Sequence, residues 1–91
     1  MERISPLRKR IDEIDEQILR SLKERVEVCV TIGAIKREHK IPVTDASREN
    51  ELNKRLRERA TSLGLSHSHI QAVYREIVTM CKYVQERNAK T

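Results

Sequence analysis

Apolar residues recur every three or four positions along three stretches of the chain, and no stretch alternates strictly between apolar and polar residues. The two prolines and two glycines divide the chain into three pieces at positions that agree with this periodicity. The pattern predicts an all-α fold of three helices, without strands, in a single domain spanning residues 1–91.

The first predicted helix is much longer than the other two. Ser5 followed by Pro6 has the form of an N-cap with proline at the first helical position. At the other end, the residue before Pro42 is disfavoured in a helix. We therefore expect this helix to run from about Ser5 to near His39.

The second and third helices are delimited by capping residues. Thr44 or Asp45 can cap the second helix, which is expected to stop at Gly64. Ser66 is expected to cap the third helix, and the polar tail Asn88–Thr91 to fray. The apolar stripe of the second helix consists of Leu52, Leu56, Ala60 and Leu63. The stripe of the third consists of Ile70, Tyr74, Ile77, Val78, Cys81 and Val84.

The length of the first helix bears on the assembly. About 34 residues at 1.5 Å each span roughly 50 Å, whereas a compact globule of this chain length is only about 31 Å across. The overhanging half keeps an apolar stripe, formed by Leu7, Ile11, Ile14 and Ile18. Because the simplest cover for this stripe is the same helix of a second copy, we predict an intertwined helical homodimer.

Composition supports an oligomer and narrows the class of protein. Lys and Arg number 19 against 14 Asp and Glu, a formal net charge of +5, and the chain has no Trp or Phe to build a large core of its own. No apolar run approaches the roughly 20 residues of a membrane helix, and the charged N-terminus is unlike a secretory signal. We expect a cytoplasmic protein. Cys29 and Cys81 lie far apart in the sequence and suggest neither a disulfide framework nor a zinc site.

Several polar residues fall on the apolar faces of the helices. At 100° per residue, Arg25 and Lys36 both lie within about 20° of the stripe of the first helix. Gly33 beside them costs that helix about 1 kcal/mol relative to Ala, which close approach by a ligand or by another helix would justify. Glu49 lies on the apolar face of the second helix, and Gln85 on that of the third.

Each such residue has an ordinary structural explanation when taken alone. A lone Arg or Lys at a stripe edge commonly extends to water, Asp45 can act as an N-cap only, and Cys81 can simply fill space. Arg48 near the same helix start is by default a solvated cation. Taken together, however, the buried-side residues carry more cations than carboxylates, and internal pairing cannot neutralise the excess. We therefore expect an anion to bind among them.

Arg8 is a further candidate at a distance. It lies about 25 Å from Arg25 along the same helix and cannot reach a site in its own subunit. In a crossed dimer, the overhanging first turns can reach the pocket of the partner, which would make a site of mixed subunit origin.

The ordered set of these residues resembles the all-helical class of chorismate mutase. The resemblance runs without a gap from Leu7 to Gln85 and rests on Leu7-Arg8, Ile11-Asp12-Glu13-Ile14-Asp15, Glu24-Arg25, Ile32-Gly33 with Lys36, Pro42-Val43 with Asp45, Arg48-Glu49, and Gln85. It implies an intertwined dimer of three-helix subunits that rearranges chorismate to prephenate, the branch step toward phenylalanine and tyrosine, without cofactor or metal. Docking onto another shikimate-pathway enzyme stays open.

The resemblance also implies roles for the cations and the amide. Arg8 of the partner subunit and Arg25 would bind the substrate carboxylates. Lys36 would contact a carboxylate and the ether oxygen, and Gln85 would donate a hydrogen bond to the same ether oxygen. By the same resemblance, the reaction depends on Lys36 and Gln85 as hydrogen-bond donors.

For the remaining site residues the resemblance implies supporting contacts. Glu49 would hold the ring hydroxyl, and Asp45 and Arg48 would assist at the start of the second helix. Cys81 stands where the family often has Ser. Because a thiol is a weaker donor than a hydroxyl, a contact of Cys81 with the substrate stays open.

Three other functions are compatible with parts of the sequence. An isochorismate pyruvate lyase of the same fold handles a differently placed ring hydroxyl, and Glu49 favours the mutase over it. A basic nucleic-acid-binding protein is suggested by the cations of residues 48–59, but carboxylates are interleaved among them and aromatic residues for stacking are absent. In a non-catalytic helical adaptor, Arg25 and Lys36 would merely pair internally.

Overall fold

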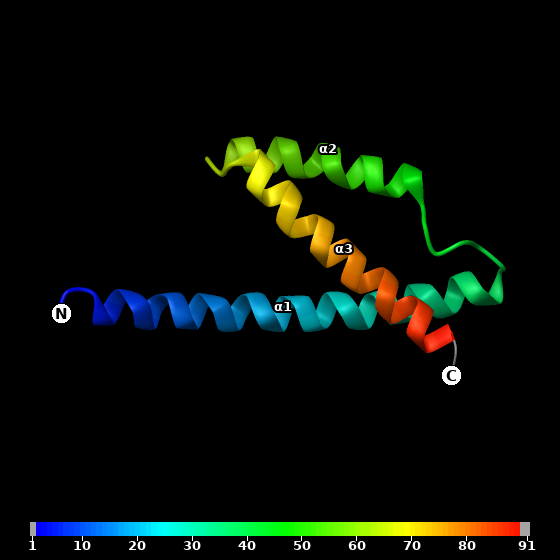
Figure 1. The fold of residues 1–91 in the computed structure, drawn as a ribbon, viewed down its shortest axis with the longest axis horizontal. Helices are drawn as coiled ribbons and strands as arrows, with labels where there is room; N and C mark the ends of the chain where they lie inside the picture. The colour runs from blue at the N-terminus through cyan, green and yellow to red at the C-terminus, as the bar shows by residue number, and fades with distance from the viewer. Residues whose placement is uncertain (1, 90–91) are drawn as a thin grey trace.

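The structure, a computed structural model that describes residues 2–89, consists of three helices joined by short connections (Figure 1). They are α1 (Ser5–Glu38), α2 (Ala46–Ser62) and α3 (His67–Ala89), so the all-α prediction is confirmed. The tail expected to fray, Asn88–Thr91, still belongs to α3 at its first two residues, and its last two lie outside the described residues. None of these three helices combines the length and the apolar character needed to cross a membrane.

The third helix, α3, is the central element of the fold. It packs against the C-terminal half of α1 and against α2, whereas the backbones of α1 and α2 do not come into contact within the described residues (Figure 1). The molecule measures 56 × 30 × 14 Å and has a radius of gyration of 16.6 Å. A compact domain of this length would have a radius of gyration of about 12 Å. The N-terminal half of α1 extends well beyond the other helices, as its length predicted.

The overhanging half of α1 leaves its apolar stripe in solvent. Leu7 is 64% exposed, Ile11 55% and Ile18 51%. The chain exposes 7745 Å² in total, against about 5,500 Å² for a compact monomer of the same mass. Among the described residues the buried apolar side chains are few: Leu52, Leu56, Ala60 and Cys81. A single copy of the chain therefore buries little apolar surface for its size.

The start of α1 corrects one prediction. Ser5 is not the N-cap, because Ile4 takes that position and its carbonyl accepts a hydrogen bond from the Arg8 N–H at 2.9 Å. Ile4 has φ −89° and ψ −38°, so the helix is entered through a helical turn and not through the extended residue that a Ser cap requires. Pro6 still lies in the first turn, where its missing N–H leaves no helical hydrogen bond unmade.

The capping residues of α2 and α3 are as predicted. Asp45 is extended and its side chain accepts a hydrogen bond from the Arg48 N–H at 3.0 Å. The carbonyl of Ser66 accepts from the Ile70 N–H at 3.0 Å, and its hydroxyl lies 2.6 Å from Nδ1 of His69. Both residues thus bind backbone or side-chain groups of the first helical turn.

The turn after α2 confirms the predicted stop at Gly64. Gly64 is left-handed with φ 71°, the Leu65 N–H donates to the Ala60 carbonyl at 2.8 Å, and the Gly64 N–H donates to Thr61 at 3.2 Å. Leu63, expected on the apolar stripe, is 60% exposed because it lies just beyond the last helical residue.

The turn after α1 has the same hydrogen bonds around a lysine. Lys40 is left-handed with φ 56°, the Ile41 N–H donates to the Lys36 carbonyl at 2.7 Å, and the Lys40 N–H donates to Arg37 at 3.1 Å. A left-handed residue with a side chain costs about 1 kcal/mol. The turn ends α1 two residues after Lys36, at Glu38, and sends the chain back toward α2.

Candidate functional site

A cavity of about 270 Å³ lies where α1, α3 and the start of α2 meet, which is near the lower end of the range for small-molecule sites. Seven of the eight residues singled out from the sequence line it: Arg25, Lys36, Asp45, Arg48, Glu49, Cys81 and Gln85. The eighth, Arg8, lies on the overhanging start of α1 and does not line it. The fold thus brings together side chains from three helices and the connection between α1 and α2.

The charges around this cavity are predominantly positive. Its charged lining residues are Arg25, Lys36, Arg48 and Lys82 against Asp45 and Glu49. The formal charge of the lining is therefore +2. The other residues, apart from Gln85, are apolar or sulfur-containing: Val28, Cys29, Ile32, Val43, Leu52, Val78 and Cys81. Such a lining favours a small anion that carries two negative groups.

The ammonium group of Lys36 is directed into the cavity by the turn that follows α1. Nζ donates a hydrogen bond to the Val43 carbonyl at 3.0 Å. An ammonium group has three protons, so two remain for a ligand. Because the Lys36 carbonyl is itself bound by the Ile41 N–H, both ends of this lysine are fixed by the same connection.

Arg25 points from α1 to a pair of thiols. Its Nη1 lies 2.7 Å from Sγ of Cys81 and 4.0 Å from Sγ of Cys29. Burial of the Cys81 thiol, with a hydrogen bond to Cys29, raises the pKa of Cys81 from 9.0 to about 11, so the thiol is neutral at neutral pH. The sequence did not predict that these two free cysteines meet. Since neutral thiols are weak acceptors, a carboxylate would be a much stronger partner for Arg25.

Gln85 is the most deeply buried polar residue of the site. It is 7% exposed, and within the described residues its Oε1 is buried without a hydrogen-bond partner. A buried polar atom left unpaired costs about 1–3 kcal/mol. An unsatisfied buried group of this kind calls for a specific explanation, of which contact with a ligand is one.

Gly33 explains how Gln85 comes so close to α1. A Cβ added at Gly33 would lie 2.8 Å from Cγ and 3.1 Å from Cβ of Gln85. Of the two explanations left open by the sequence, the glycine therefore makes room for α3 and not for a ligand. It is also the buried residue of α1, which is otherwise half-buried or exposed.

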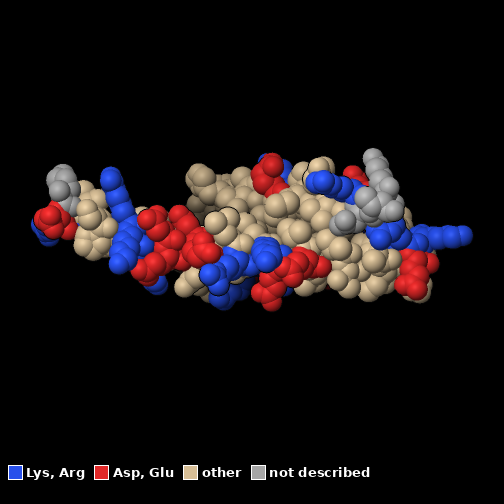
Figure 2. Space-filling view, turned by 90° about the horizontal axis from the view of Figure 1, so that it is seen from below, with Lys and Arg blue, Asp and Glu red and all other residues tan. Residues whose placement is uncertain are grey.

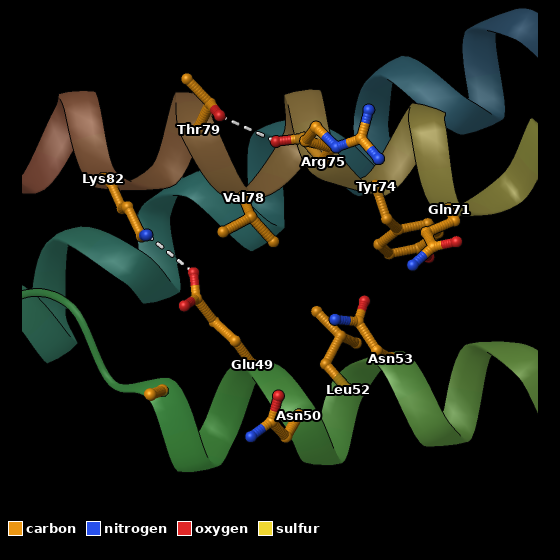
Figure 3. A pocket seen from close by; sticks show the side chains of 11 residues that line it. Glu49, Asn50, Leu52, Asn53, Gln71, Tyr74, Arg75, Val78, Thr79 and Lys82 are labelled. Atoms are coloured by element: carbon orange, nitrogen blue, oxygen red, sulfur yellow. Dashed lines mark hydrogen bonds and ion pairs between the residues drawn. The ribbon is translucent and has the colours of Figure 1, made fainter.

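Glu49 forms an ion pair that the sequence did not predict. Its Oε1 lies 2.7 Å from Nζ of Lys82, and the two side chains are 34% and 32% exposed (Figure 3). Lys82 lies about 40° from Val78 around α3, on the side that faces α2. This position, together with a charge opposite to that of Glu49, is the feature of the sequence from which the ion pair could have been predicted.

Asp45 and Arg48 are engaged mainly in local contacts at the start of α2. Asp45 caps the helix, and Nη1 of Arg48 lies 2.6 Å from Oε1 of Glu51 in an exposed ion pair. Asp45 and Arg48 thus supply charge at the rim of the cavity. The hydrogen-bonding groups of its interior come from Arg25, Lys36 and Gln85.

A second and larger cavity, of about 340 Å³, lies between α2 and α3 (Figure 3). It shares Glu49, Leu52, Val78 and Lys82 with the first, so these four residues form the wall between the two. Its remaining side chains are mostly amides and hydroxyls, with Arg75 as its one additional charge. The first cavity is the better candidate for chemistry because it holds the clustered cations and the unpaired amide.

The structure also bears on nucleic-acid and metal sites. On the face shown in Figure 2, Lys and Arg are interspersed with Asp and Glu and form no continuous positive surface for nucleic acid. Residues 2–89 contain no group of three or more His, Cys, Asp or Glu side chains placed to hold a metal ion.

Comparison with known proteins gives consistent matches. Residues 7–86 match the family described as chorismate mutase type II. A bifunctional chorismate mutase/prephenate dehydratase of Aquifex aeolicus is 34% identical over 96% of this chain and 25% of its own length. A chorismate mutase of Methanocaldococcus jannaschii is 37% identical over 63% of this chain and 58% of its own. A 4-amino-4-deoxychorismate mutase of Streptomyces pristinaespiralis is 26% identical over 84% and 59%. The chain thus spans less than two thirds of the length of each of these relatives.

Proposed function

Because the chain belongs to the type II chorismate mutase family, we propose that it is an isomerase that rearranges chorismate to prephenate, on the route to phenylalanine and tyrosine. The observation that carries the proposal is the convergence of Arg25, Lys36 and Gln85 on one cavity whose lining has a formal charge of +2. Chorismate has two carboxylates and so matches this charge. The names of the relatives from Aquifex and Methanocaldococcus support the same substrate.

The reaction suits a site that has donors but no nucleophile. A Claisen rearrangement breaks a C–O bond and forms a C–C bond within one molecule, so it needs a compact substrate conformation and stabilisation of charge on the ether oxygen. The two protons that Lys36 has left and the Nε2 protons of the Gln85 amide would supply that stabilisation. A millionfold acceleration is about 8 kcal/mol, which two or three preorganised donors at about 3 kcal/mol each can provide together with conformational restriction.

The carboxylates of the substrate would be held by arginines. Arg25 would exchange its weak contact with the Cys81 thiol for one carboxylate. Arg8 of a second copy would bind the other, and Glu49 would accept a hydrogen bond from the ring hydroxyl. Cys81, neutral and released by Arg25, would fill space beside the substrate and does not need to contact it.

We further propose that the active form is the intertwined homodimer. The exposed surface exceeds that of a compact monomer by about 2,200 Å², and the apolar stripe of α1 lies exposed within it. Burying that area on each subunit would give an interface in the range of obligate dimers. Sedimentation equilibrium should give a mass of two chains at micromolar concentration, and a stable monomer would contradict the proposal.

The contribution of Arg8 to the partner's site has a direct test in mixed dimers. Arg8→Ala and Lys36→Ala chains should each be inactive alone. If sites are shared, a heterodimer of the two has one site with both Arg8 and Lys36 intact, so refolding a 1:1 mixture should restore about a quarter of the wild-type activity. If Arg8 acts within its own chain, the mixture stays inactive.

The name of one relative bears on a possible partner enzyme. The Aquifex relative is named for a prephenate dehydratase as well as a chorismate mutase. We propose that this chain acts in the cytoplasm and can dock onto an enzyme that consumes prephenate. The test is to mix this protein with an enzyme that consumes prephenate. A change in mutase kinetics would support docking, whereas unchanged kinetics without association of the two proteins would contradict it.

The substrate itself is tested by offering chorismate and isochorismate separately and identifying the products. Formation of prephenate from chorismate supports the proposal. Release of pyruvate from isochorismate, without turnover of chorismate, would favour the lyase of the same fold. No turnover of either compound would contradict an enzymatic function of this cavity.

A further inference from the structure

We infer that Lys82 determines which ring substituent the site accepts, favouring an uncharged hydroxyl and disfavouring a protonated amine at the position that Glu49 contacts. This inference rests on the proposed function, because it concerns the group on the substrate that Glu49 would hold. Lys82 would be a specificity-determining residue that acts through Glu49 and through its own charge.

The geometry ties the two side chains to each other and to the cavity. Nζ of Lys82 on α3 lies 2.7 Å from Oε1 of Glu49 on α2, and each side chain is about two thirds buried. Both line the candidate site and the second cavity, so the ion pair stands in the wall between them. Figure 3 shows the pair among the residues of the second cavity. No other acidic side chain among the described residues forms an ion pair with Lys82.

The ion pair leaves Glu49 suited to a neutral donor. Oε1 is occupied by Lys82, and Oε2 can still accept a hydrogen bond from a hydroxyl group of the ligand. The ammonium group also offsets the negative charge of Glu49, which would otherwise repel the carboxylates of a dianionic ligand. A hydroxyl-bearing substrate therefore gains an acceptor without an added repulsion.

A protonated amine in the same place would be repelled by the charge of Lys82. A protonated amine that binds Oε2 of Glu49 would stand about 5 Å from Nζ of Lys82, because both nitrogens would contact one carboxylate. Two positive charges at that distance in a partly buried site repel strongly. A substrate with an ammonium group would thus be disfavoured relative to one with a hydroxyl group. One relative of this chain is named for an amino-substituted compound, 4-amino-4-deoxychorismate, which supplies the probe.

The test compares two substrates in one enzyme preparation. The ratio of kcat/KM for chorismate to kcat/KM for 4-amino-4-deoxychorismate is measured for the wild type and for Lys82→Met, at a pH where the amine is protonated. We expect Lys82→Met to shift the ratio about tenfold toward the amine, after allowance for solvent screening. Because both values come from the same protein, partial loss of folding cancels in the ratio.

Two further variants separate charge from other effects. Lys82→Arg keeps the charge and should keep the wild-type ratio. Lys54→Met removes an exposed lysine of α2 that lines neither cavity, and it should change neither rate. An unchanged ratio in Lys82→Met, or the same shift in Lys82→Arg, would overturn the inference.

Failure of the proposed function would be recognised separately. If the wild type turns over neither compound, the proposed reaction is wrong. The affinities for chorismate and 4-amino-4-deoxychorismate are then measured by calorimetry, and the ratio of the two dissociation constants is compared between the variants. A shift of that ratio in Lys82→Met would still support charge selection by Lys82, and equal affinities in all variants would refute it.

Discussion

The contact between Gly33 and Gln85 gives a prediction in which stability and activity respond differently to one methyl group. In Gly33→Ala the new Cβ would lie 2.8 Å from Cγ and 3.1 Å from Cβ of Gln85. Rotation of the Gln85 side chain can relieve only the first contact, because the second involves an atom fixed to the backbone of α3. The amide of Gln85 must therefore move relative to the cavity, or α3 must shift away from α1.

The two energetic consequences for folding oppose each other. Replacing a helical glycine by alanine stabilises α1 by about 1 kcal/mol. Overpacking of a close contact costs about 1–3 kcal/mol. The free energy of unfolding should therefore fall by between zero and about 2 kcal/mol. Displacing one preorganised donor from the reacting oxygen costs about 3 kcal/mol in the transition state, or about a hundredfold in kcat.

The assay measures chorismate consumption together with urea unfolding for Gly33→Ala, Gln85→Ala and the double variant. If Gly33→Ala acts through Gln85, the double variant should lose no more activity than Gln85→Ala alone. Ala34→Gly serves as the control, because it alters helix propensity at an exposed neighbouring position and should leave kcat unchanged. Wild-type kcat in Gly33→Ala would refute the reasoning.

The site also predicts two responses to pH. Gln85 does not titrate, so wild-type activity should stay level from pH 5 to pH 7, whereas Gln85→Glu should lose activity as the pH rises and the new carboxyl loses the proton it donates; a wild-type loss over this range would contradict the assignment. For Cys81, whose pKa is raised above its ordinary value of 9.0 to about 11, folding favours the neutral thiol, so its contribution to stability is present below about pH 9 and is lost as the pH rises toward 11. Urea unfolding at pH 8 and pH 11 should show a larger loss for the wild type than for Cys81→Ser, and equal losses would exclude this linkage.

The helices and the cationic side of the site follow from local periodicity. The wheel positions of Arg25 and Lys36 depend only on the regular geometry of α1, and both side chains line the cavity as that geometry requires. The caps at Asp45 and Ser66 and the stop at Gly64 are equally local. Such features can be derived because the interacting residues lie within one or two turns of each other.

The features that the sequence did not provide depend on contacts between helices or on backbone conformation. The ion pair of Lys82 with Glu49 and the meeting of Cys29 with Cys81 depend on how α3 packs on its neighbours, and the pattern of a single helix does not fix that packing. The error at Ser5 has another cause. A Ser followed by Pro has the composition of a cap, but the helical backbone of the preceding residue moves the cap one position earlier.

The most direct test of the account is the product formed from chorismate by the wild type and by Lys36→Ala, with the mass of each protein checked in solution. We predict rapid formation of prephenate by the wild type and a loss of about a hundredfold or more in Lys36→Ala at unchanged oligomeric mass, because in the proposed reaction the variant would lack the ammonium group that stabilises charge on the ether oxygen. Absence of prephenate with the wild type, or full activity in Lys36→Ala, would contradict the assignment of this cavity as the catalytic site.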